Sequence, residues 1–174
     1  GTEKSIADAL IIRTLITILE EFGFTDLIVD INSMGDRETR PLFIKELTNY
    51  YKKHLEHLCK DCHERIKTNP LRLLDCKQEQ CQPYKEQAPS SLSFLASDAR
   101  SHFKEVLQYL EEMGIPYRVN NSLVRGQSYY TRTVFEVIKV DTDESGKEKE
   151  ITITGGGRYD NLAKMMGNKK DVPA

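Results

Sequence analysis

The residues best suited to chemistry lie between positions 123 and 136, where the sequence reads LVRGQSYYTRTVFE. Arg125 carries a planar guanidinium that matches a carboxylate or a phosphate in a two-pronged contact. Gly126 lets the backbone turn or approach a ligand closely, and two phenols follow at Tyr129 and Tyr130. The next residues alternate as a strand does, so a polar small-molecule site at the mouth of a strand is one interpretation. The alternative is an ordinary surface loop that enters a strand.

The elements that must position this stretch follow from hydrophobic periodicity and from glycine and proline punctuation. The strand after the two phenols has apolar residues on both faces, which indicates an inner strand of a sheet. The polar run at residues 141–150 predicts a long hairpin loop. We expect helices at residues 6–22, 39–58 and 97–113, and strands at residues 27–31, 116–120, 131–140 and 151–154.

A second stretch with ligand-binding potential is GGGRYDNL, at residues 155–162, directly after the last expected strand. Three glycines allow close approach of backbone or ligand, but they lack the GxGxxG spacing and the lysine of a phosphate-binding loop. Their position at a strand end beside the Arg125 hairpin supports a ligand-binding role for them. We expect Tyr159 to reach the same pocket as Arg125.

All four cysteines of the chain lie within 23 residues, as Cys59-x2-Cys62 and Cys76-x4-Cys81. Two close thiolate pairs joined by a short connection can surround one tetrahedral Zn²⁺ ion. Four reduced thiols are an alternative, and disulfides are another that a reducing cytosol disfavours. We therefore expect a structural zinc site within a helical segment too small to hold a large core of its own.

The length, composition and charge limit the kinds of protein that this chain can be. The chain has 174 residues, 39% hydrophobic and 30% charged, which is typical of one globular domain with at most a small appendage. A net charge of −2 argues against wholesale electrostatic capture of nucleic acid, although a local basic patch is compatible with it. No apolar run approaches the length of a membrane helix, and no secretion signal is visible, so we expect a cytoplasmic protein.

Three motifs together resemble the histidyl-tRNA synthetases, a class II aminoacyl-tRNA synthetase family. They are LVRGQSYYTRTVFE at residues 123–136, GGGRYDNL at residues 155–162 and NPLRLLDCK at residues 69–77. The resemblance spans nearly the whole chain in the family's order. One departure is Gln127-Ser128, where the family usually has Leu-Asp. The missing carboxylate is expected to affect how this loop is oriented.

The resemblance implies roles for individual residues. Arg125 corresponds to the catalytic arginine that contacts the α-phosphate of ATP while histidyl-adenylate forms, and it also borders the histidine site. Phenol hydroxyls can donate to one imidazole nitrogen or accept from the other, so they can recognise a histidine side chain. The resemblance assigns histidine binding to Tyr129, Tyr130 and Tyr159, and close substrate approach to Gly126, Gly156 and Gly157.

The implied fold is α+β: a partial class II antiparallel sheet with flanking helices, interrupted by a helical insertion. We expect residues 1–44 and 114–174 to form the partial catalytic core, and residues 45–113 to form the insertion with the four cysteines. The implied substrates are histidine, ATP with Mg²⁺, and tRNA(His), and the intact enzyme is expected to be a homodimer. The family's first two motifs should precede residue 1 and its third should follow residue 174, so we expect the chain alone not to form histidyl-adenylate.

Two other functions compete with the ligase. A non-catalytic paralogue of the synthetase binds histidine as a regulatory subunit in histidine biosynthesis, but such a regulator does not need the phosphate-binding Arg125. A tRNA-binding or zinc-binding module would use a basic face on the insertion. Acidic residues are interspersed among its lysines and arginines, so an ordinary solvent-exposed face explains the same pattern equally well.

Overall fold

The computed structural model describes residues 1–142, 146 and 148–174. The expected helices and strands are confirmed, although the helix predicted at residues 39–58 ends at Lys53 and is followed by a separate 3₁₀ turn, Leu55–His57. The helices are α1 (Ser5–Glu21), α2 (Arg40–Lys53), α3 (Lys60–Thr68), α4 (Gln82–Glu86), α5 (Ser97–Glu112) and α6 (Leu162–Met165), and the strands are β1 (Leu27–Ser33), β2 (Tyr117–Val119), β3 (Thr133–Thr142) and β4 (Glu148–Gly157). Further 3₁₀ turns occur at Pro70–Leu73, Glu79–Cys81 and Ser91–Phe94.

The strands form one sheet in the order β2-β1-β3-β4, and this confirms the expected α+β class. β3 pairs antiparallel with both β1 and β4, so it is the inner strand that its two apolar faces predicted. β2 is the exception to an antiparallel sheet, because it lies parallel to β1. Helix α5 supplies the crossover that a parallel neighbour requires.

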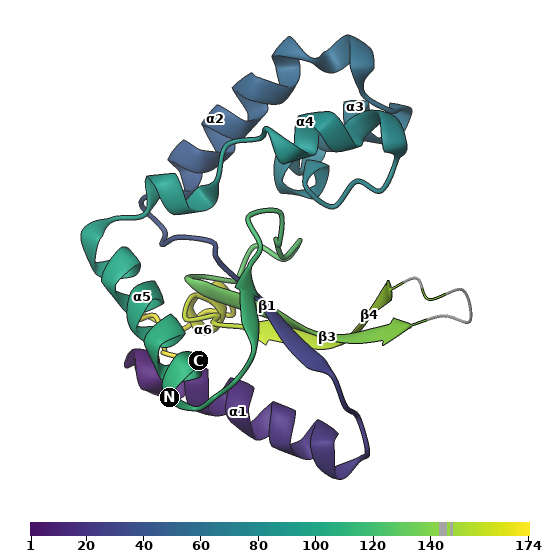
Figure 1. The fold of residues 1–174 in the computed structure, drawn as a ribbon. Helices are drawn as coiled ribbons and strands as arrows, with labels where there is room; N and C mark the ends of the chain where they lie inside the picture. Colours follow the sequence, from purple (N-terminus) through teal and green to yellow (C-terminus); the bar gives the residue numbers. More distant parts are fainter. Residues whose placement is uncertain (143–145, 147) are drawn as a thin grey trace.

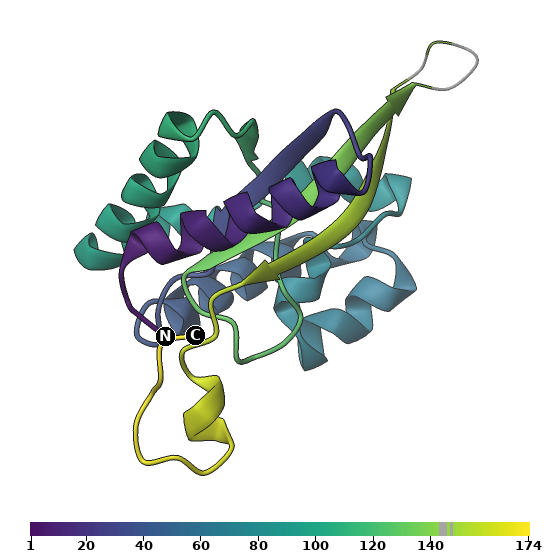
Figure 2. The same ribbon diagram turned by 90° about the horizontal axis from the view of Figure 1, so that it is seen from below.

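The two faces of the sheet differ in polarity because side chains alternate along each strand. Val29 and Ile31 of β1 and Phe135 and Val137 of β3 pack on one face beneath α1 and α5. Figure 2 shows α1 lying across that side of the sheet, with α5 beside α1. The intervening positions mix apolar residues such as Val134 and Ile138 with polar ones, namely Asp30, the fully buried Asn32 and Glu136. The polar face is therefore the face available for a site.

A second apolar cluster joins the expected insertion to the sheet: it includes Leu47 and Tyr51 of α2 and the buried cysteines, together with Leu123 and Val134. In Figure 1, α2, α3 and α4 gather on the opposite side of the sheet from α1. Helix α5, expected within the insertion at residues 45–113, instead packs against α1 and contributes Phe103 and Val106 to the sheet cluster. The domain boundaries stay a prediction, but α5 packs with the segments that were expected to form the catalytic core.

The β3–β4 hairpin corrects two expectations about loops. Thr142 still pairs with Glu148, so strand structure continues into the polar run that was expected to be loop. Residues 143–145 and 147 of that predicted loop lie outside the described residues. At the other end β4 extends to Gly157, so the three glycines pair within the ladder and do not follow it. Polar residues can form such a ladder where both faces of a hairpin arm meet water.

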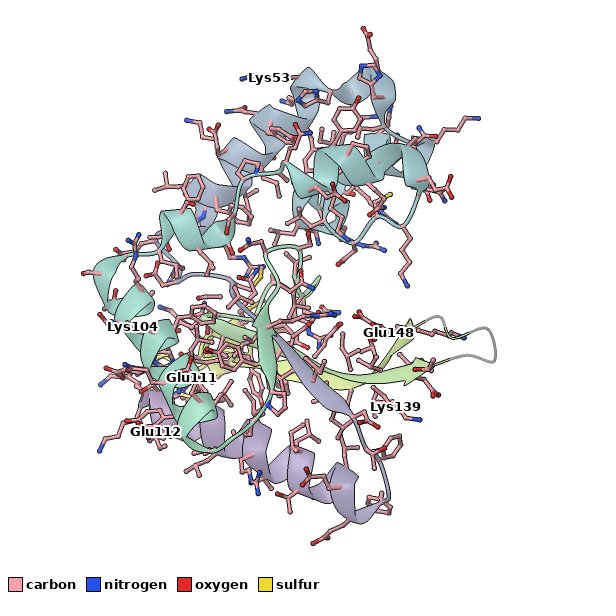
Figure 3. The ribbon with its side chains drawn as sticks, viewed as in Figure 1. Lys53, Lys104, Glu111, Glu112, Lys139 and Glu148 are labelled. Carbon is pink, nitrogen blue, oxygen red and sulfur yellow. The ribbon has the colours of Figure 1, made fainter. Side chains whose placement is uncertain are left out.

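Charged side chains cover the outside of the molecule. Those of Lys53, Lys104, Glu112 and Glu148 point away from the body of the fold (Figure 3). Within the described part of the chain, none of the helices combines the length and the hydropathy needed to cross a bilayer.

Candidate functional site

Arg125 lies on the polar side of the sheet, where β3 fixes its guanidinium from two directions. Its Nη2 donates to the carbonyl oxygen of Phe135 at 2.9 Å, and its Nη1 lies 3.3 Å from Oε1 of Glu136. Its Nε is buried and has no hydrogen-bond partner among the described residues. A buried donor without a partner is costly in a folded chain, and the side chain as a whole is 24% exposed and lines a cavity open to a ligand.

The close approach of Arg125 to the sheet depends on Gly155. A Cβ atom at this position would overlap Nη2 of Arg125 and would lie 2.7 Å from the carbonyl oxygen of Phe135. From the sequence, Gly155 was expected only as one of three glycines that permit close approach, and Glu136 was not expected at the site. Glu136 could have been found from the alternation of β3, since it interrupts an apolar strand with a carboxylate on the polar face.

The three tyrosines expected to bind the histidine side chain come together in space, but Tyr159, expected to share the pocket of Arg125, lines a different cavity with Asp8 and Phe135. The ring centroids of Tyr129 and Tyr130 are 4.8 Å apart, and the ring of Tyr159 lies 6.1 and 6.2 Å from them at nearly right angles. Edge-to-face packing of this kind stabilises aromatic clusters. Burial raises the pKa of Tyr130, and the nearby charge of Arg125 acts on it in the opposite direction. At neutral pH the Tyr130 hydroxyl is therefore protonated and available as a donor.

The loop that carries Arg125 and the tyrosine pair is held by Arg40 at the start of α2 and by Asn69. Nη1 of Arg40 donates to the carbonyl oxygens of Ser128 and Tyr130, at 3.0 and 2.8 Å. Nδ2 of Asn69 donates to the carbonyl oxygen of Gly126 at 3.1 Å. Arg40 was not predictable from the sequence, because a single arginine at the start of a helix is usually solvated.

The three glycines expected to let substrate approach occupy different surroundings. A Cβ on Gly156 would meet the ring of Phe135 at 3.1 Å, on the face covered by α1, and not on the face of Arg125. A Cβ on Gly157 would lie 2.6 Å from the carbonyl oxygen of Thr133, while one on Gly126 would meet nothing within 4 Å. The role of these glycines in substrate approach stays a prediction.

A cavity of about 470 Å³ lies beside Arg125, between the polar face of the sheet and the insertion. Glu136 lines it from the sheet, and Asp75, Lys77 and Lys85 line it from the insertion. Burial raises the pKa of the Asp75 carboxyl. Cations from both sides of one cavity suit a polyanionic ligand, and an Arg–Lys combination is a common phosphate-binding set.

A buried charge network anchors Tyr159 through its neighbour Arg158, which is 4% exposed. Nη2 of Arg158 lies 3.1 Å from a carboxylate oxygen of Asp8 in α1, and Nη1 lies 2.9 Å from Asp160. Nε2 of His102 in α5 lies 2.9 Å from the other Asp8 oxygen. Burial opposes ionisation of Asp8, but its bonds to His102 and Arg158 prevail and lower its pKa. The network ties the end of β4 to both helices beneath the sheet.

The four cysteines form one cluster inside the insertion. Their sulfur atoms all lie within 4.8 Å of one another, and Sγ of Cys59 is 3.8 Å from Sγ of Cys76. Cys62, Cys76 and Cys81 are buried, and Cys59 is partly exposed. Burial raises the pKa of Cys81 to about 11, so that thiol on its own is neutral at pH 7. The fold thus brings together all four residues that the spacing predicted as metal ligands.

Comparison with known proteins matches residues 1–174 to the family model described as histidyl-tRNA synthetase. Histidine–tRNA ligase from Halothermothrix orenii is 43% identical over 173 residues, which cover 97% of this chain and 39% of that protein. The ligase from Symbiobacterium thermophilum is 39% identical over 169 residues, with 97% and 38% covered. A crystal structure of apo histidyl-tRNA synthetase from S. aureus matches with a TM-score of 0.70 and 30% identity, covering 98% of this chain and 40% of that one. The chain therefore spans about two fifths of the length of these relatives.

Proposed function

Because this chain belongs to the histidyl-tRNA synthetase family, we propose that it forms the central part of a histidine–tRNA ligase and carries half of its adenylation site. In that reaction a carboxylate oxygen of histidine attacks the α-phosphorus of ATP. The bond from the α-phosphorus to the bridging oxygen breaks, and pyrophosphate leaves. The histidyl group then passes from the adenylate to the 3′ end of tRNA(His).

The observation that carries this proposal is the state of Arg125. Its guanidinium is pinned at Phe135 and Glu136, and it retains a buried Nε donor without a partner in the described chain. We assign it to the α-phosphate, where a fixed cation opposes the negative charge that develops during attack. Because the guanidinium is held before ATP arrives, little reorganisation is needed at the moment of reaction. Lys77 and Lys85 line the same cavity and supply further positive charge.

We assign recognition of the histidine side chain to the cluster of Tyr129, Tyr130 and Tyr159. An imidazole offers one donor and one acceptor, and a phenol hydroxyl can satisfy either. A site built from such groups rejects amino acids that leave buried hydroxyls without partners, so it discriminates more strongly than an apolar pocket. Arg40 supports this by holding the backbone at Ser128 and Tyr130.

The partners follow from the same assignment. We propose that the intact ligase uses histidine, ATP with Mg²⁺, and tRNA(His), and that it works as a cytoplasmic homodimer. Mg²⁺ would neutralise charge on the phosphates and orient the leaving pyrophosphate. Arg125, on this chain, provides the fixed positive charge at the α-phosphorus.

Histidine-dependent exchange of pyrophosphate into ATP tests this function in the full-length protein. The ligase assignment predicts exchange with histidine and none with other amino acids. Histidine binding without any exchange would contradict the proposal and would favour the regulatory paralogue. The presence of Arg125 favours the ligase, since a regulator that binds only histidine has no phosphate for it to contact.

A further inference from the structure

We propose that Cys59, Cys62, Cys76 and Cys81 bind one zinc ion, and that this ion positions the segment Asn69–Asp75 against the loop that carries Arg125. The proposal has two parts, a metal site and a mechanical link. Each rests on contacts within the insertion and neither requires the ligase activity.

The geometry of the sulfur atoms fits zinc. A regular tetrahedron with Zn–S bonds of about 2.3 Å has sulfur–sulfur edges of about 3.8 Å. The Cys59 and Cys76 sulfurs are 3.8 Å apart, and none of the four sulfurs is more than 4.8 Å from another. Small shifts of side chains would complete the tetrahedron. With four sulfur ligands the site is closed to water, as structural zinc sites are, whereas catalytic sites keep one position open.

One neighbouring backbone donor favours a thiolate sulfur at this cluster. The backbone N–H of Cys59 donates to Sγ of Cys81 at 3.3 Å. A thiolate bound to zinc is a better acceptor than a thiol, and such outer partners orient metal ligands.

The ligands come from three short elements that also share one apolar cluster. Cys59 caps α3 and Cys62 lies in its first turn, Cys76 follows the Pro70–Leu73 turn, and Cys81 ends the next 3₁₀ turn. Helical elements this short are only marginally stable on their own. One ion that joins them would add folding free energy to that of the apolar cluster around Leu58 and Leu71.

The mechanical link runs from Cys76 back through the segment Asn69–Asp75. Leu71, Leu73 and Leu74 of this segment are at most 2% exposed and pack in one cluster with Leu123 and Val124, the two residues before Arg125. At the far end of the segment, Asn69 donates to the carbonyl oxygen of Gly126, the residue after Arg125. The segment thus touches the chain on both sides of Arg125. Zinc bound at Cys76 would fix one end of the segment Asn69–Asp75.

Elemental analysis of the chain, purified without added metal, tests the first part. We expect about one zinc per chain, and loss of most of it in Cys62→Ser and Cys76→Ser. Val106→Ala, which opens a cavity in the other core cluster, is the matched control and should keep the zinc. Less than about 0.2 zinc per chain, or two disulfides without metal, would overturn the site.

Amide hydrogen exchange tests the second part. Removal of zinc from the wild-type chain with a chelator should speed exchange at residues 69–75 and 123–128 by on the order of tenfold or more, with β1 and β3 unchanged. Asn69→Ala should keep one zinc and speed exchange only at residues 123–128. Unchanged exchange at residues 123–128 after zinc removal would overturn the link, and so would equal acceleration throughout β1 and β3.

Discussion

Replacing Gly155 by alanine should displace Arg125 and strain the sheet at the same time. The new Cβ would lie 2.7 Å from the carbonyl oxygen of Phe135, which is backbone and cannot rotate away, and 2.9 Å from Cζ of Arg125. Overpacking of this kind costs about 1–3 kcal/mol of folding free energy. The guanidinium must also leave its bonds to Phe135 and Glu136. Gly126→Ala is the stability control, because its Cβ meets nothing within 4 Å.

A double-mutant cycle separates the two contributions. In an Arg125→Ala background the overlap with the guanidinium is gone and only the contact with the Phe135 carbonyl remains, so Gly155→Ala should destabilise the chain less than it does in wild type. Urea denaturation followed by circular dichroism measures the four free energies of unfolding. A coupling energy within about 0.3 kcal/mol of zero would refute the contact between Gly155 and Arg125. Wild-type stability of Gly155→Ala would refute the steric argument altogether.

Two further predictions concern the supports of the site. Asp8→Asn removes a buried charge beside Arg158 and His102 and should cost about 3 kcal/mol at neutral pH. The pKa of Asp8 lies below its ordinary 3.8, so the stability that its ionised form contributes is present above that value and is lost as the pH falls through the depressed pKa. The difference in unfolding free energy between wild type and Asp8→Asn should therefore narrow in acid. A difference that does not change with pH would contradict the stabilising role of the Asp8 charge. Arg40→Met removes the donor to Ser128 and Tyr130 while keeping a similar apolar stem, so histidine affinity of the full-length protein should fall with little loss of stability, as calorimetry would show. Unchanged affinity in Arg40→Met would contradict the anchoring role.

The order of elements was predictable because local patterns carry it. The helix at Ser5–Glu21 and the inner strand at Thr133–Thr142 follow from periodicities that survive in the fold. The cysteine spacing likewise predicted a cluster that the fold assembles. These features depend on neighbours within a few residues, or on one motif whose parts lie close in the chain.

Long-range contacts were not predictable in this way. Nothing local to Gly155 shows that its missing side chain makes room for Arg125, 30 positions earlier in the sequence. The support from Arg40 depends on α2 passing the tyrosine loop, and the α1 contact of α5 depends on how the crossover returns to the sheet. The polar end of the β3–β4 hairpin was expected to be loop because composition does not reveal strand pairing on a solvated arm.

The effect of Arg125→Ala on the full-length protein tests the central claim most directly. Histidine-dependent pyrophosphate exchange and histidine binding should be measured side by side, with the exposed Arg13→Ala as the control. If Arg125 stabilises charge at the α-phosphate, the adenylation rate should fall by on the order of 10²–10³ while the dissociation constant of histidine changes far less. Equal losses in rate and in histidine affinity, or an unchanged rate, would contradict the account.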